Sequence, residues 1–265
     1  MSIATRIAGL KMMLRFDNRC QLIVDRLLFR STIAIYRYRG CKILVDHERG
    51  DAPGVRACLA SDMYRQFISS MKLAGPLSLL DCGANTGGFP LLFHAEGFDF
   101  SKVVCVEMNP YTHSRLQYNL FTNIASELHC LNLIVEDTAK VHSVRLGAGS
   151  TGDSLLQTNT SGRDFAIRSI SVNDLVMNYF GETAVDVVKI DIEGAEHILF
   201  SGGNFDRLSQ CRHIVIEIHA VAQDRYCDVV GAIRNLGFSL VKQDADVFLF
   251  SNDRLHDALS LDREQ

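Results

Sequence analysis

The sequence predicts a single α/β domain in which helices cover both faces of a mainly parallel sheet. Three observations predict it. Short apolar segments alternate with segments of helical spacing from residue 77 to residue 250, a glycine-rich turn follows the first apolar segment, and 265 residues suit one large domain. Strands that alternate with helices become parallel, because each helix returns the chain to the edge where the next strand starts.

Each element of this alternation is marked by an apolar run or by residues that end a helix. Strands are expected at 77–81, 103–107, 128–135, 185–191 and 213–218, and helices at 57–73, 89–96, 112–121, 172–179, 195–200 and 225–236. Between 140 and 172 the pattern indicates a short β-pair that carries a polar active-site loop at 147–162. The turn at 243–246 predicts a hairpin of 238–241 with 247–250, which makes one C-terminal strand antiparallel.

A basic extension, residues 1–43, precedes the domain at 44–251 and the tail at 252–265. Residues 1–42 hold nine Lys and Arg against Asp17 and Asp25, a net +7, and since the chain carries −4 the rest carries −11. Apolar residues at helical spacing predict an amphipathic helical region, and 33–45 predicts a β-hairpin around Arg39-Gly40. We expect it to cover the domain or to pair two copies as a homodimer, with a membrane surface or RNA as the alternative; nucleic acid is not the expected partner.

Composition indicates a soluble, cytoplasmic protein. No apolar run approaches the ~20 residues of a membrane span, which excludes an integral membrane segment. The eight cysteines form no C-x-x-C pair and several lie in apolar runs, so we expect reduced thiols and neither disulfides nor a zinc site. The start of the chain also lacks the pattern of a secretory signal.

The strongest local signal is residues 79–88, Leu-Leu-Asp-Cys-Gly-Ala-Asn-Thr-Gly-Gly, where a strand runs through a glycine turn into a helix. Such a turn lets a ligand touch the backbone. Glu107 ends the next strand, where a carboxylate can accept hydrogen bonds from both ribose hydroxyls of an adenosine. The predicted cofactor-binding residues are Asp81, Gly83, Ala84, Asn85, Thr86, Gly87, Glu107, Met108, Asn109 and Asp191.

The spacing of the glycines decides between two nucleoside cofactors. A dinucleotide fingerprint would need glycine at 83, 85 and 88, but residue 85 is Asn. S-adenosylmethionine has no pyrophosphate, so it suits this turn better than NAD. An NAD-type oxidoreductase is the alternative enzyme, and a catalytically inactive binding module of the same fold is the alternative outside enzymes.

Four segments together resemble one family. They are the turn, Val-Glu-Met-Asn-Pro at 106–110, Val-Lys-Ile-Asp-Ile-Glu-Gly-Ala-Glu at 188–196 and Glu-Ile-His at 217–219, and over roughly residues 60–250 they resemble the FkbM family of methyltransferases. The resemblance implies a seven-stranded, Rossmann-like class I methyltransferase fold. It also implies S-adenosylmethionine-dependent O-methylation of a hydroxyl on a sugar, glycan or natural product. The basic residues 1–42 depart from the shorter lead-in that is usual in the family.

The acceptor end is predicted from two strands. Alternation along 185–191 puts Lys189 and Asp191 on one face, either as a structural ion pair or with Lys189 orienting Asp191 toward cofactor or substrate. Alternation along 213–219 puts Glu217 and His219 on one face, near Asp191 and Glu193.

Methyl transfer to a hydroxyl needs a proton acceptor. We rank His219, with an ordinary pKa near 6.5, and Glu217 above Asp191 and Glu193. In the alternative, Asp191, Glu193 and Glu217 hold a divalent metal ion; the metal-free route is favoured. Glu196 and His197, in the first turn of the next helix, are expected to be structural.

Overall fold

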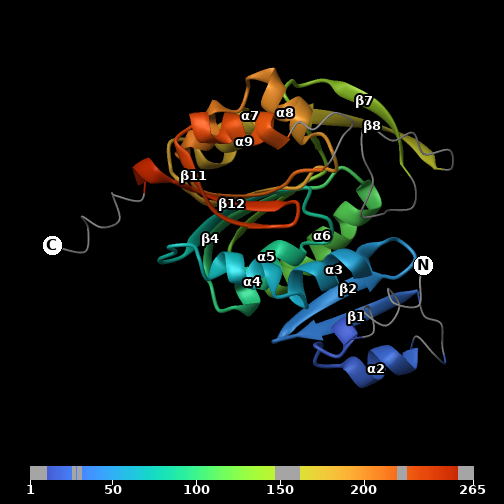
Figure 1. The fold of residues 1–265 in the computed structure, drawn as a ribbon. Helices are drawn as coiled ribbons and strands as arrows, with labels where there is room; N and C mark the ends of the chain where they lie inside the picture. The colour runs from blue at the N-terminus through green and yellow to red at the C-terminus, as the bar shows by residue number, and fades with distance from the viewer. Residues whose placement is uncertain (1–10, 26–27, 29–31, 147–161, 220–225, 256–265) are drawn as a thin grey trace.

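The central sheet is seven-stranded. Its strands are β3 (Leu77–Cys82), β4 (Phe100–Val106), β5 (Glu127–Leu131), β9 (Val185–Ile190), β10 (Cys211–Glu217), β11 (Phe238–Asp244) and β12 (Val247–Asn252). The protein is seen in a computed structural model that describes residues 11–25, 28, 32–146, 162–219 and 226–255 (Figure 1). The strand order is β11-β12-β10-β9-β3-β4-β5, and β12 runs antiparallel to both of its neighbours while the other pairs are parallel. This Rossmann-like sheet confirms the predicted fold class, including the antiparallel C-terminal strand.

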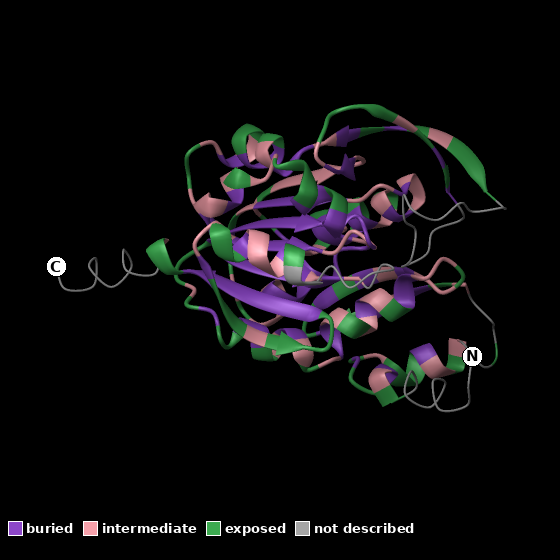
Figure 2. Cartoon of the chain, turned by 45° about the horizontal axis from the view of Figure 1, so that its top comes forward, coloured by how far each residue is buried: buried purple, intermediate pink, exposed green. Residues whose placement is uncertain are grey.

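Helices cover both faces of this sheet. One layer holds α3 (Asp51–Leu59), α4 (Met63–Ile68), α5 (Gly88–Ala95) and α6 (Pro110–Asn123); the other holds α7 (Val172–Phe180), α8 (Glu196–Gly202), the 3-10 helix η2 (Asp206–Gln210) and α9 (Tyr226–Asn235) (Figure 1). Neighbouring residues of one strand enter different cores: Val187 packs with the first layer and Val188 with the second. The central strands of the sheet are therefore buried on both faces, as Figure 2 shows.

The described part of the N-terminal extension packs on the domain. It comprises α2 (Arg19–Val24) and the antiparallel hairpin of β1 (Ile33–Tyr38) with β2 (Cys41–Asp46). Phe16 is fully buried against the rings of Tyr36 and Tyr38, and Asn18 hydrogen-bonds the backbone of β1. This segment shares the core of the first helical layer. That the whole extension serves as a cover of the domain stays a prediction.

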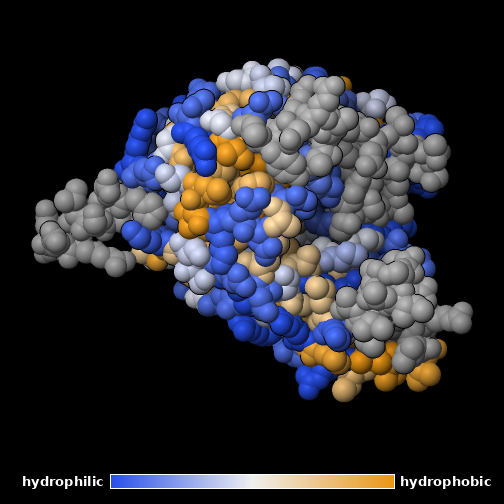
Figure 3. Space-filling view, in the orientation of Figure 1, coloured by the Kyte–Doolittle hydropathy of each residue, from blue (hydrophilic) through white to orange (hydrophobic). Residues whose placement is uncertain are grey.

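The outer side of this segment stays apolar. Leu14, Val24 and Leu28 are 51%, 43% and 73% exposed. Figure 3 shows hydrophobic atoms at the lower edge of the molecule, in the region of α2. Pairing of two copies through this surface stays a prediction.

The predicted boundaries of one helix and one strand are wrong. The helix expected at 57–73 is two helices, α3 and α4, because the Arg65 guanidinium donates to the carbonyls of Leu59 and Ser61 and ends α3 there. The strand expected at 128–135 ends at Leu131, since the Asn132 side chain turns to the carbonyls of Glu107 and Met108.

Beyond that break the chain enters a separate sheet of three strands. β6 (Ile134–Val135) pairs with β8 (Arg163–Ile170), which pairs antiparallel with β7 (Val141–Leu146) as the predicted β-pair. Of the loop that this pair was expected to carry, 147–161 lies outside the described residues. None of the described helices has the length and apolar character of a membrane span. The free thiols are Cys20, Cys41, Cys58, Cys82, Cys105, Cys130 and Cys211.

Candidate active site

A cavity of about 480 Å³ opens where β3 and β9 lie side by side. At this point the strand order reverses, and open α/β sheets bind ligands outside the carboxyl ends of their strands at such a switch point. The predicted site residues that line the cavity are Gly83, Ala84, Asn85, Thr86, Glu107, Met108, Asp191, Glu193, Glu217 and His219. Two separate sequence motifs therefore meet in one cavity.

Gly83 is required by contact between two loops. Its φ is +81°, and a Cβ there would lie 1.8 Å from the carbonyl oxygen of Asp191. The Gly83 N–H donates to Val106, and the Asp191 N–H donates to Cys82. The glycine turn and the loop after β9 thus touch backbone to backbone, a reason for glycine that the cofactor argument did not include.

Glu107 is held by the backbone on both sides. One of its carboxylate oxygens accepts from the Asn85 N–H at 3.0 Å and the other from the Asn109 N–H at 2.8 Å. Asn85 has a positive φ of 49°, which is uncommon for a residue with a side chain and is found often at functional sites. The two bonds orient the carboxylate at the cavity.

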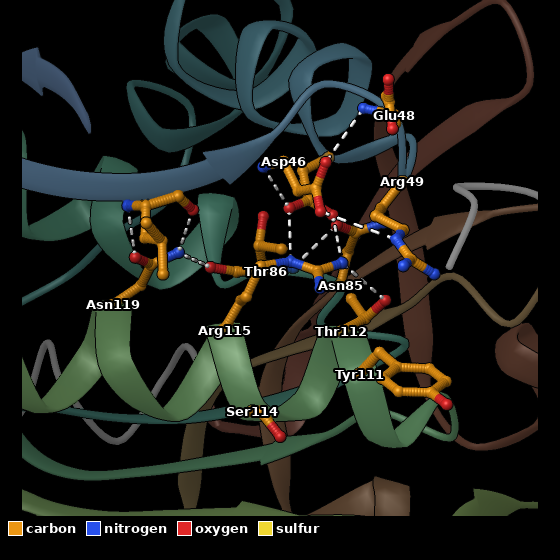
Figure 4. Close-up of polar contacts among 12 residues, drawn as sticks. Asp46, Glu48, Arg49, Asn85, Thr86, Tyr111, Thr112, Ser114, Arg115 and Asn119 are labelled. Carbon is orange, nitrogen blue, oxygen red and sulfur yellow. Dashed lines mark hydrogen bonds and ion pairs between the residues drawn. The ribbon is translucent and has the colours of Figure 1, made fainter. Parts of the chain in front are cut away.

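The glycine turn is also tied to the N-terminal hairpin. The buried Asn119 amide on α6 donates to the carbonyls of Thr86 and Leu44, and its oxygen accepts from the Leu44 N–H (Figure 4). Beside it, Arg115 forms a two-pronged ion pair with the buried Asp51 carboxylate at the start of α3 (Figure 4). The N-terminal hairpin therefore supports the glycine turn, which sequence periodicity could not show.

A buried charge cluster underlies the cavity. Lys189 is 4% exposed, and its ammonium lies 2.8 Å from Asp191 and 3.7 Å from Asp81. Asp81 is fully buried, and within the described part of the chain neither of its oxygens has a hydrogen-bond partner. Burial raises the pKa of Asp81 to about 6, although the Lys189 charge opposes the rise. Burial lowers the pKa of Lys189, but Asp191 and Asp81 outweigh it and raise that pKa above its ordinary value.

The loop after β9 has an unusual backbone. Glu193 has a φ of 53° and Gly194 a φ of 94°. The fully buried Glu196 accepts hydrogen bonds from the N–H groups of Ile192 and Gly194 at 2.9 Å. Burial and the charge of Asp191 raise the pKa of Glu193 to about 7, a value suited to proton exchange near neutrality.

His219 joins three carboxylates. Its Nδ1 lies 3.2 Å from Glu196, and its Nε2 lies 3.3 Å from Glu193 and 3.8 Å from Glu217. The hydrogen bond to Glu196 raises the pKa of His219 to about 9. The expectation of an ordinary pKa near 6.5 is therefore wrong, because this imidazole has acidic partners on both nitrogens.

Three predicted cofactor residues do not line the cavity. Asp81 lies beneath it in the charge cluster. Gly87 packs against Leu116 and Leu120, and the Asn109 side chain accepts from backbone N–H groups in the first turn of α6. Gly87 and Asn109 thus have structural tasks in the turn and the helix, and a direct role in binding has no support from their positions.

The cavity also includes residues that the sequence did not predict as site residues. Pro53, Gly54, Ala57, Cys58 and Tyr64 come from α3 and α4, Leu133 comes just before β6, and Ile134 and Val135 form β6. None of them belongs to a motif that the sequence analysis singled out. Lys189, which also lines the cavity, had a visible signal, a lysine inside an apolar strand.

The metal alternative involves a different set of residues from the predicted one. Among the described residues, Asp191, Glu193 and His219 place potential ligand atoms within 4.8 Å of one another. Glu217, which the prediction included, is not in this group. Two of these ligand atoms, on Glu193 and His219, lie 3.3 Å apart as an ion pair.

The chain matches one family model and several solved structures. The family is described as the methyltransferase FkbM domain and matches residues 81–240, more than half of the chain. A search of curated proteins gives no match.

Among solved structures, an FkbM methyltransferase from Methylobacillus flagellatus is 13% identical, with 94% of this chain and 59% of that chain covered and a TM-score of 0.42. A Streptococcus pneumoniae tRNA (m1A22) methyltransferase, in complex with S-adenosyl-L-methionine, is 14% identical, with 72% of each chain covered and a TM-score of 0.41. A precorrin-6y C5,15-methyltransferase from Geobacter metallireducens is 14% identical, with 71% and 86% covered and a TM-score of 0.41. On the family match, the chain belongs to the FkbM methyltransferases.

Proposed function

We propose that the protein transfers a methyl group from S-adenosylmethionine to a hydroxyl oxygen of a sugar, glycan or other polyhydroxylated natural product. One observation carries the proposal: a single cavity joins the glycine turn and Glu107 at one side to a histidine among carboxylates at the other. The first side suits an adenosine, and the second suits a hydroxyl that must lose a proton.

The cofactor side fits S-adenosylmethionine on its chemistry. Glu107 presents a carboxylate that the backbone orients, and Gly83 to Thr86 present a turn without the glycine that a pyrophosphate needs at residue 85. Met108, Leu133 and Ile134 add apolar lining. The bound cofactor supplies a methyl group on a cationic sulfonium, while Asp191 in the cavity lining and the buried Asp81 beneath it supply negative charge.

The acceptor side suits a molecule with several hydroxyls. Asp191, Glu193 and Glu217 all line the cavity and can accept hydrogen bonds, while His219 Nε2 lies between the latter two. We infer that His219 takes the proton of the reacting hydroxyl and that the carboxylates orient the acceptor. Glu217, whose pKa is raised by burial and by Asp191, is the alternative base.

The test is methyl transfer from S-adenosylmethionine with a labelled methyl group to a panel of monosaccharides, methyl glycosides and phenols, with amines and tRNA in parallel. We expect label in a methyl ether. Calorimetry with S-adenosylhomocysteine and NAD accompanies it. Binding of NAD with no response to S-adenosylhomocysteine, or label only in an N-methyl or C-methyl product, would refute the proposal.

Replacing Glu107 with alanine should weaken binding of S-adenosylhomocysteine by about 1.5–3 kcal/mol, because hydrogen bonds to a charged acceptor are lost. Calorimetry measures the change, and the midpoint of thermal unfolding checks the fold. Asp99→Ala, at the opposite end of the sheet where β4 begins, is the control and should bind as the wild type does. An unchanged dissociation constant in Glu107→Ala would assign ribose binding to another residue.

Three further expectations belong to this proposal. The homodimer through the apolar outer side of α2, the cytoplasmic location and the absence of a required metal stay predictions.

A further inference from the structure

We propose that Glu196 is a positioning residue for the acceptor side and sets which nitrogen of His219 faces the acceptor. The inference rests on the proposed function, because it gives a task to the imidazole of that site. The sequence placed Glu196 in the first turn of a helix and indicated only a structural role. Its contacts show that it joins the two segments that carry the acceptor residues.

Glu196 binds both segments with one buried carboxylate. Oε1 accepts from the Ile192 N–H at 2.9 Å and lies 3.2 Å from His219 Nδ1, while Oε2 accepts from the Gly194 N–H at 2.9 Å. The side chain is fully buried, so water does not compete for these oxygens. A buried carboxylate that loses its hydrogen-bond donors costs free energy. Glu196 therefore holds the loop after β9 next to the segment that follows β10.

The bond to His219 also decides the tautomer. A carboxylate only accepts, so His219 must carry its hydrogen on Nδ1. The lone pair of the neutral imidazole is then on Nε2, the nitrogen beside Glu193 and Glu217 at the cavity. The backbone of His219 is held as well, since His197 Nε2 donates to the His219 carbonyl at 2.9 Å.

Glu196→Gln tests this directly because glutamine has the same shape. Its amide can donate to Nδ1 and so favour the opposite tautomer, with hydrogen on Nε2. A neutral histidine held in that tautomer cannot accept a proton from the acceptor. The analogous exchange beside the histidine of serine proteases costs about 10⁴-fold. We expect turnover to fall about 10²-fold or more, with a smaller effect on S-adenosylhomocysteine binding.

The tautomer of His219 can be measured directly, and it should not change if Glu196 only stabilises the fold. Nitrogen-15 NMR of the imidazoles, assigned with His219→Ala and recorded with a chelator from pH 6 to 10, should show neutral His219 protonated on Nδ1 in the wild type. In Glu196→Gln the fraction of neutral His219 with its hydrogen on Nε2 should rise, because an NH2 group in the place of Oε1 donates to Nδ1, whereas one in the place of Oε2 faces the Gly194 N–H. The acidic groups around the ring, Glu193, Glu196 and Glu217, are titrated in the same series.

Two control variants distinguish a role of Glu196 in positioning His219 from a role in the stability of the fold. Glu136→Gln makes the same exchange at another buried carboxylate bonded to a histidine, His142, and should lower stability without lowering turnover. The double variant Glu196→Gln with His219→Ala should be no slower than His219→Ala alone, because Glu196 acts through His219. An unchanged tautomer, or an additive loss in the double variant, overturns the proposal. If the wild type methylates no acceptor, the proposed function fails, while the NMR result still decides the role of Glu196.

Discussion

Alanine at position 83 is expected to lower the free energy of unfolding by about 2–6 kcal/mol, the sum of backbone strain at a positive φ and overpacking. The new Cβ would lie 1.8 Å from the Asp191 carbonyl oxygen and 2.8 Å from its carbon. Neither backbone can yield easily, because both segments are held by hydrogen bonds at the ends of β3 and β9. This is a large share of the ~5–15 kcal/mol that a domain has in total. Denaturant unfolding measures it, and S-adenosylhomocysteine binding should be lost with it.

Gly97→Ala is the matched control. Gly97 has a φ of +91°, and a Cβ there would meet nothing within 4 Å. It therefore carries the backbone strain without the clash, and the difference between the two variants measures the contact of the two loops. Equal losses in the two variants would show that the loop contact adds nothing.

Replacing His219 with alanine is expected to lower turnover by about 10²–10⁴-fold, the usual contribution of a general base, and to leave cofactor affinity nearly intact. His219 lines the side of the cavity that we propose for the acceptor, whereas Glu107 and the glycine turn line the side that we propose for the cofactor. His129→Ala, at a histidine that also pairs with a glutamate but lies on β5 outside the cavity lining, should keep full turnover. Chelators should have no effect on the wild type. Full activity of His219→Ala together with sensitivity to chelators would move the chemistry to the carboxylates and a metal.

The pH dependence of the methyl-transfer rate is expected to follow the protonation of His219. With a pKa of about 9, His219 is mostly protonated at neutral pH, so the rate at low acceptor concentration should rise with pH up to about 9. If Glu193 with its pKa of about 7 were the base, the rate would level off above about 7. Stability changes in the opposite sense. Because the folded state raises the pKa of His219, its contribution to the free energy of unfolding is complete below about 6.5 and is lost as pH rises through about 9.

Much of the fold could be predicted from periodicity because it is local. The apolar strands and the helices between them specify a parallel sheet, and the turn at 243–246 specifies the reversed β12. The boundaries at Leu59 and Leu131 could not be predicted, since Arg65 and Asn132 end those elements through side-chain bonds to carbonyls. Those bonds depend on neighbours that the folded chain brings together.

The sequence by itself determined the family, the sheet, and the two motifs at 81–87 and 188–196, because strand ends of a parallel sheet meet at one edge whatever surrounds them. Only the tertiary structure decided what these residues do there. It showed that Gly83 is required by the Asp191 backbone, that Asn119 ties the cofactor turn to the N-terminal hairpin, and that Glu196 holds His219. It also overturned the ordinary pKa of His219, because a pKa depends on the charges and burial around a group, and those exist only once the distant segments have packed together.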